Sequence, residues 1–185
     1  MMNEIDFFNH LLGETKEVFL KSKTRKHNPN ENWNYAVCDT PIQKGKGIFF
    51  GLNWGKKDKN AQSAYPTADK KRKWHFISSS RSYFREFIAS EIENLNYSNL
   101  CFLRTPKAFK LHPSDWELTL PLFRKYVEYI DPPWTLMLGK PSPLLNRHLT
   151  EESSFYVFDE KNNRKVYGYN GMLFGKYPFG AVPHP

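Results

Sequence analysis

The sequence has few cysteines and no long apolar segment. Its 185 residues include only Cys38 and Cys101, which lie far apart and form no Cys-x-x-Cys pair. We therefore expect buried thiols rather than a thiolate metal or iron–sulfur site. No apolar run approaches the roughly 18 residues that a membrane helix needs, and the N-terminus lacks a basic-then-apolar signal pattern. We expect a cytoplasmic protein with no membrane partner, no metal and no cofactor.

Basic charge and aromatic rings are abundant instead. Lys and Arg outnumber Asp and Glu by 27 to 19, which gives a net charge of +8, and 16% of the residues are aromatic. A basic surplus attracts polyanions over long distances, which favours a nucleic-acid partner, although many small proteins are equally basic. With 39% hydrophobic residues the chain can bury one sizeable core, so we predict a single domain over residues 1–185.

Short apolar runs alternate with segments of helical periodicity. Runs typical of buried parallel strands cover 47–52, 99–103, 134–139 and 180–182. Apolar residues at helical spacing predict helices over 3–21, 78–95, 114–130 and 143–152. This alternation predicts an α/β fold: a three-layer α/β/α sandwich around a central, mainly parallel four-stranded sheet.

Two segments add to this core. Residues 1–45 supply the N-terminal helix and a basic loop, 21–34, which we expect to pack on the domain. The apolar runs 155–158 and 166–169 flank a charged turn, which indicates a β-hairpin or a connecting excursion.

Polar residues follow or end several predicted strands. They are Asn53 after the first run, Asn99 to Arg104 in and after the second, Gly139 after the third and His184 after the last. In an open parallel sheet, ligands bind at the carboxyl ends of the strands, where loops and helix N-termini converge. Each residue alone suits a turn, so the prediction of a site rests on their convergence.

Three motifs in chain order resemble those of the uracil-DNA glycosylase superfamily. Gly51-Leu52-Asn53-Trp54-Gly55 resembles the first motif, in the Gly-x-Asn-x-Gly form of the mismatch-specific and single-strand-selective branches. The run from Asn99 to Pro106 is similar to the strand that supplies a base-reading Asn, and Val182-Pro183-His184-Pro185 resembles the final His-Pro-Ser motif. The resemblance spans about residues 47–185 and implies the fold of that superfamily.

The resemblance implies a DNA glycosylase of base-excision repair, which hydrolyses the N-glycosidic bond of uracil or a related deaminated base. The target nucleotide leaves the base stack to reach the active site, so uracil-containing or mismatched DNA is the expected partner. The alternatives are a non-catalytic nucleic-acid-binding protein of the same fold and a small-nucleotide-binding α/β protein in which Asn53 contacts phosphate. We expect a monomer.

The resemblance also implies a role for each site residue. Asn53 holds the attacking water through its side-chain carbonyl, Asn99 pairs with the edge of uracil and rejects cytosine, and His184 stabilises the anion that develops near uracil O2. Gly51 and Leu52 line the base-binding site. The structural alternatives are a turn or helix cap at Asn53, a backbone-binding amide at Asn99 and an ordinary loop residue at His184.

A ring and a basic loop complete the predicted DNA contacts. Tyr65 lies twelve residues beyond Asn53, where the family usually has a ring that stacks on the flipped base, and Phe76 is the alternative. The cations of the lysine-rich loop 56–73 either clamp phosphates or form an ordinary solvated charge run. The residues assigned to DNA here are Lys56, Lys57, Lys71 and Arg72.

Three features depart from the family pattern. Trp54 stands where these branches usually carry Pro, and Asn53 replaces the Asp of the fastest branch, which predicts modest hydrolysis or none. His112-Pro113-Ser114 spells the final motif in the middle of the chain, but Ser114 and Glu117 have capping-box spacing, so we interpret a helix start without a catalytic role. Pro121 falls within the first two turns of that helix, so a later start is also open.

Overall fold

The computed structural model describes residues 2–27, 34–54, 61–67, 94–105, 110–160 and 163–183. In this part of the chain six strands form one sheet, in the order β2-β1-β3-β6-β5-β4. The strands are β1 (Ile48–Trp54), β2 (Asn96–Arg104), β3 (Thr135–Leu138), β4 (Leu149–Asp159), β5 (Arg164–Leu173) and β6 (Tyr177–Val182). The helices are α1 (Glu4–Lys21), α2 (Lys23–His27), α4 (Pro113–Ile130) and α5 (Pro143–Asn146).

Four neighbouring strands, β2, β1, β3 and β6, run parallel, whereas β5 pairs antiparallel with both β6 and β4. The α/β class with a parallel core is therefore confirmed. The predicted four-stranded sheet is wrong, because the described strands form a mixed sheet of six. The reason lies in the turn after β5. Phe174 and Gly175 both have positive φ, which folds the chain back so that Leu173 pairs with Tyr177 and the β4–β5 hairpin joins the sheet.

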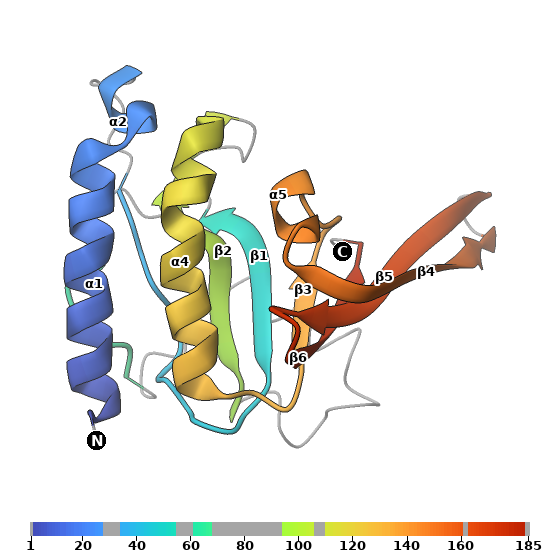
Figure 1. Ribbon diagram of the computed structural model, residues 1–185, viewed down its shortest axis with the longest axis horizontal. Helices are drawn as coiled ribbons and strands as arrows, with labels where there is room; N and C mark the ends of the chain where they lie inside the picture. The colour runs from blue at the N-terminus through green and yellow to red at the C-terminus, as the bar shows by residue number, and fades with distance from the viewer. Residues whose placement is uncertain are drawn as a thin grey trace.

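Helices α1 and α4 lie side by side on one face of the parallel strands (Figure 1). Aromatic side chains of β1 and β2 face α4: Phe50 packs on Phe123, with ring centroids 4.9 Å apart, and Phe102 packs edge-on against Tyr126. Burial of these rings supplies much of the core. The helix predicted over 78–95 lies outside the described residues except for its last two positions, so a helical layer on the second face remains a prediction.

Helix α4 begins two residues before the start that the capping box predicts. Its N-cap is His112, whose Nδ1 accepts a hydrogen bond from the Ser114 amide at 3.3 Å, and Pro113 occupies the first turn. The helix then continues through the exposed Pro121 to Ile130, so the later start is wrong. The interpretation of this segment as a helix start is confirmed, with a histidine rather than a serine as the cap.

Helix α5 is shorter than the predicted helix over 143–152. It begins after Ser142, whose hydroxyl accepts a hydrogen bond from the Leu145 amide at 3.2 Å, and it ends at Asn146. The rest of the predicted helix is strand, because Leu149 already pairs with Leu173 at the start of β4.

Strands β4 and β5 form the predicted hairpin and extend away from the helices as a two-stranded ribbon (Figure 1). The pairing register shifts between Thr150 and Ser153, where Glu151 has a φ of 54°. Such a bulge bends the strand and increases its twist. The bulge packs against Gly171, where an added Cβ would lie 2.8 Å from the Thr150 carbonyl oxygen. Glycine at this position therefore allows the ribbon to leave the sheet at its observed angle.

Candidate functional site

The half-buried side chain of Asn53 lies at the carboxyl end of β1. Its Nδ2 donates to the Thr105 hydroxyl at 2.7 Å, and also to the backbone oxygens of Thr105 and Trp54 at 3.3 and 3.2 Å. Backbone oxygens only accept hydrogen bonds, so the amide nitrogen must face them and the carbonyl oxygen Oδ1 must face away. No residue that the structure describes donates to this Oδ1. Asn53 therefore presents a fixed, available acceptor.

Asn99 lies beside Gly51 on the neighbouring strand, and the two are register partners. The Asn99 side chain lies over the Gly51 backbone: a Cβ added to Gly51 would be 2.6 Å from Asn99 Oδ1. Asn99 is only 9% exposed, yet its amide has no hydrogen-bond partner among the described residues. The amide atoms of Asn99 are not among the fully buried atoms without a partner, so they keep some access to solvent and a ligand can reach them. This amide is therefore suited to a ligand.

The two asparagines share one face of the sheet. Asn53 follows Gly51 by two residues, and the irregularity of β1 begins only after Asn53, so the alternation of the strand places both on the same side. Asn53 pairs with Cys101 and Gly51 with Asn99, which puts the Cα atoms of the two asparagines about 8 Å apart from strand spacing and rise. The structure thus brings Asn53, Gly51 and Asn99 together. We call these three residues the amide site.

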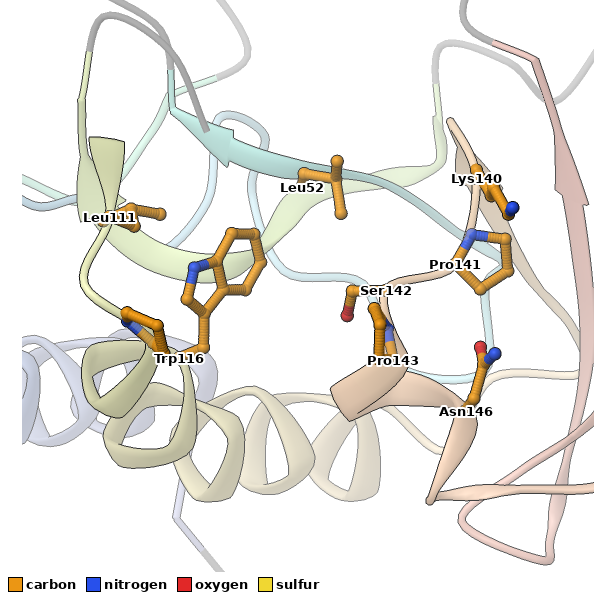
Figure 2. A pocket seen from close by; sticks show the side chains of 9 residues that line it. Leu52, Leu111, Trp116, Lys140, Pro141, Ser142, Pro143 and Asn146 are labelled. Carbon is orange, nitrogen blue, oxygen red and sulfur yellow. The ribbon is translucent and has the colours of Figure 1, made fainter. Parts of the chain in front are cut away.

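Leu52 faces the opposite side of β1 and does not belong to the amide site. It lines an apolar cleft of about 620 Å³ between β1, the start of α4 and the loop from β3 to α5. Figure 2 shows the indole of Trp116 extending from α4 toward Leu52. The full lining is Leu52, Leu111, Pro113, Trp116, Lys140, Pro141, Ser142, Pro143 and Asn146. Placing Leu52 and Asn53 in one base-binding site is therefore corrected, because adjacent residues of a strand point to opposite faces.

Tyr65 does not lie at the carboxyl ends of the strands. Its hydroxyl accepts a hydrogen bond from the Ile42 amide at 2.7 Å, and its ring meets Phe8 of α1 edge-on. The next residue, Gln43, is bonded to Asn96, the first residue of β2, so Tyr65 belongs to the amino end of the sheet. Partial burial raises the pKa of its phenol. The predicted stacking role is corrected to a structural one.

The remaining predicted residues lie outside the described residues. They are His184, Lys56, Lys57, Lys71 and Arg72, and their roles stay predictions. Strand β6, which precedes His184, ends beside β3: Val182 pairs with Leu138 and accepts a hydrogen bond from the Gly139 amide at 2.7 Å.

Two residues at the end of β2 and directly after it, Arg104 and Thr105, receive no role from the sequence pattern. Thr105 fixes the orientation of the Asn53 amide, and its own amide donates to the Trp54 carbonyl at 3.1 Å. Arg104 is buried, with its guanidinium 5.5 Å from the centre of the Trp54 ring. The signal that could have found them is the one that pointed to Asn53, a polar pair directly after an apolar run. The cleft residues gave no local signal, because they come from three distant segments.

The thiols are structural. Cys38 and Cys101 are fully buried, and burial raises the pKa of Cys101 to about 12 and that of Cys38 well above its usual value. Within the described ranges no three His, Cys, Asp or Glu side chains are grouped closely enough to hold a metal ion. The helices of this part of the chain are also too short or too polar to span a bilayer. No protein-family model and no curated protein sequence matches the chain.

Proposed function

We propose that this chain is a uracil-DNA glycosylase-like hydrolase that removes uracil or a related deaminated base from DNA. The observation that carries the proposal is the amide site. There the Asn99 amide, which has no partner among the described residues, lies on the same face of the sheet as the available carbonyl of Asn53, one strand over and two register positions away. Gly51 has no Cβ, which allows the Asn99 side chain to lie over its backbone. The parallel strand order and the net charge of +8 add support from the fold and from the expected partner.

Asn99 has the hydrogen-bonding pattern needed to recognise uracil. Its Nδ2 donates to uracil O4 and its Oδ1 accepts from N3–H. Cytosine presents an amino group in place of O4 and a bare N3, so donor would meet donor and acceptor would meet acceptor. A nearly buried amide enforces this choice strongly, because a mismatched base leaves polar groups without partners or water.

Asn53 positions the water that attacks the sugar. The water oxygen forms a bond to C1′ while the bond from C1′ to the base nitrogen breaks, and the bonding electrons leave with the base. An amide does not take up a proton at neutral pH, so the proton of the water passes to solvent or to the departing base. Positioning without a general base implies slow hydrolysis. His184 is the proposed donor to the developing base anion.

The test is release of free base from uracil-containing oligonucleotides, both single-stranded and double-stranded. We expect release by the unmodified chain and a loss of about 100-fold in Asn53→Ala, because a misplaced water forfeits the orientation effect. His184→Ala is expected to reduce release as well. The matched control is Asn9→Ala, an exposed asparagine on α1 that should leave the rate unchanged.

The same assay separates the proposal from its alternatives. Salt-sensitive binding of oligonucleotides with no release of base would favour a non-catalytic nucleic-acid-binding protein. Binding of a mononucleotide but not of oligonucleotides would favour the small-nucleotide-binding protein. Equal release by the unmodified chain and by Asn53→Ala would contradict the role of the amide site.

A further inference from the structure

The β4–β5 ribbon carries the largest exposed apolar segment among the described residues. We call residues 153–159 and 164–170 the arm. Four consecutive side chains of β4, Phe155 to Phe158, are 48%, 55%, 63% and 50% exposed, and Tyr167 of β5 is 50% exposed. The arm projects beyond the helices, away from the amide site on β1 and β2 (Figure 1). A contiguous apolar patch of this kind marks an interaction surface.

Both faces of the arm are apolar. Strand alternation places Phe155 and Val157 on one face and Tyr156 and Phe158 on the other. Within the arm, the rings of β4 contact only residues of β5. Phe155 lies over Gly168, and Tyr156 contacts Tyr167 with ring centroids 6.0 Å apart. An isolated two-stranded hairpin is only marginally stable in water. A surface that covers the arm would therefore stabilise it.

The charges around the apolar run disfavour a polyanion. Exposed carboxylates of Glu152 and Glu160 bracket the run on β4, whereas Arg164 and Lys165 lie on β5. The Lys165 ammonium is placed 4.3 Å from the Tyr156 ring centre. A phosphate backbone or an anionic lipid surface would meet the carboxylates as well as the cations. A protein surface with both signs of charge and apolar rings fits better, and a second arm has that composition.

The exposed area is sufficient for self-association. An aromatic side chain carries roughly 200 Å², so the five half-exposed side chains leave about 500 Å² open on each copy. This area is divided between the two faces of the arm, so two copies whose arms cover each other on both faces bury about 1,000 Å², the lower limit of a specific interface. Among the described strands β4 is also the terminal one, a position that proteins usually protect. We propose that the arm is a self-association surface, on which the arm of a second copy of this chain docks.

This proposal replaces the expected monomer with a dimer, and sedimentation of the full chain tests it. We expect a concentration-dependent mass that approaches twice 21.8 kDa. Val157→Lys should weaken the association by about 30-fold or more, the effect of losing one central contact. The matched control is Leu118→Lys, which places the same charge at a 45% exposed position on α4 and should leave the dimer intact. Circular dichroism and thermal melting verify that both variants are folded.

Cross-linking gives a second readout. Because Cys38 and Cys101 are fully buried, Val157→Cys introduces an accessible thiol into a chain whose own thiols do not react. Oxidation should produce a covalent dimer from Val157→Cys and not from Leu118→Cys. A mass of 21.8 kDa at every concentration, or a dimer that Val157→Lys leaves unchanged, overturns the proposal. An unmodified chain that is monomeric and that loses single-stranded oligonucleotide binding or anionic vesicle binding in Val157→Lys would overturn the proposal and assign the arm to that partner.

Discussion

Two asparagines on strand β2 are both buried, Asn96 at its amino end and Asn99 in its middle, but their side chains have different partners. At the amino end, Asn96 accepts a hydrogen bond from the Gln43 amide at 2.8 Å and donates to carbonyl oxygens of the loop before β1. Three residues further on, the amide of Asn99 has no partner among the described residues. The amide of Asn96 is held by the protein, whereas the amide of Asn99 keeps some access to solvent and stays available to a ligand. A buried polar residue therefore indicates function where the protein leaves it unsatisfied.

The largest expected effect on stability is at Asn96. Asn96→Ala should lower the free energy of unfolding by about 2–3 kcal/mol, because it leaves the partly buried Gln43 amide and Lys46 carbonyl without their side-chain partner and removes a network of hydrogen bonds. Asn99→Ala should change stability by less than about 1 kcal/mol, because it removes an amide that forms no hydrogen bond with the described residues. Urea unfolding of the two variants measures the difference. Equal losses of stability in the two variants would contradict this difference between Asn96 and Asn99.

Base release should rank the same two variants in the opposite order. Asn99→Ala removes the group proposed to read uracil, so release should fall strongly while the protein stays folded. Asn96→Ala should retain activity at temperatures where it remains folded, because Asn96 faces the loop before β1. Normal release by Asn99→Ala would contradict the proposed base-reading role.

A second prediction concerns the contact between Gly51 and Asn99. Gly51→Ala places a Cβ 2.6 Å from Asn99 Oδ1, so the amide must move. Because this atom is the end of a side chain without hydrogen bonds to the described residues, we expect a loss of stability of less than about 1 kcal/mol but a clear loss of base release. In the Asn99→Ala background the same substitution should cost much less, because the obstructing atom is gone. A double-mutant cycle measures this coupling. Additive effects would show that the amide does not occupy the space above Gly51.

The parallel core and the position of Asn53 could be predicted from sequence because both follow from local pattern. An apolar run such as 48–52 indicates a buried strand, and the residue that ends the run lies at the edge of the sheet where ligands bind. The joining of the hairpin to β6 could not be predicted, because it depends on positive φ angles at Phe174 and Gly175 that the apolar pattern does not encode. Long-range pairing has no signature within a single segment.

The errors at the site have the same origin. Tyr65 was assigned by its spacing from Asn53, but spacing along a loop does not determine which end of the sheet the ring reaches, and here its hydroxyl binds the Ile42 amide. The cleft beside Leu52 was missed because Leu111, Trp116 and Pro141 come together only through the packing of α4 and the loop after β3. Sequence pattern predicts which residues end a strand, whereas their neighbours from other segments require the tertiary structure.

A third prediction concerns the hydrogen bond that orients Asn53. Thr105→Val removes the hydroxyl that accepts from Asn53 Nδ2 at 2.7 Å, while Thr105→Ser keeps it. We expect base release by Thr105→Val to fall about tenfold, the effect of one hydrogen bond of about 1.4 kcal/mol on the water-holding group. Thr105→Ser should stay close to the unmodified chain. Single-turnover rates at saturating oligonucleotide measure the change, and equal rates in both variants would show that Thr105 does not position Asn53.

The smallest expected effect concerns Cys101, a buried group on β2 that has a partner. The Thr119 hydroxyl lies 3.4 Å from its sulfur, and burial raises the pKa of the thiol from 9.0 to about 12. Above pH 9 the unfolded chain loses this proton while the folded chain keeps it, so stability falls as the pH rises from 9 to 12 and does not depend on this group below pH 9. The slope per thiol is at most about 1.4 kcal/mol per pH unit. Between pH 9 and pH 10, Cys101→Ala should therefore lose about 1 kcal/mol less unfolding free energy than the unmodified chain, as measured by urea unfolding. Cys38 and the buried Tyr126 contribute to the slope that remains. Only the slopes of unfolding free energy against pH are compared, because the substitution also removes packing at every pH. Identical slopes would show that the folded chain releases this proton as readily as the unfolded chain.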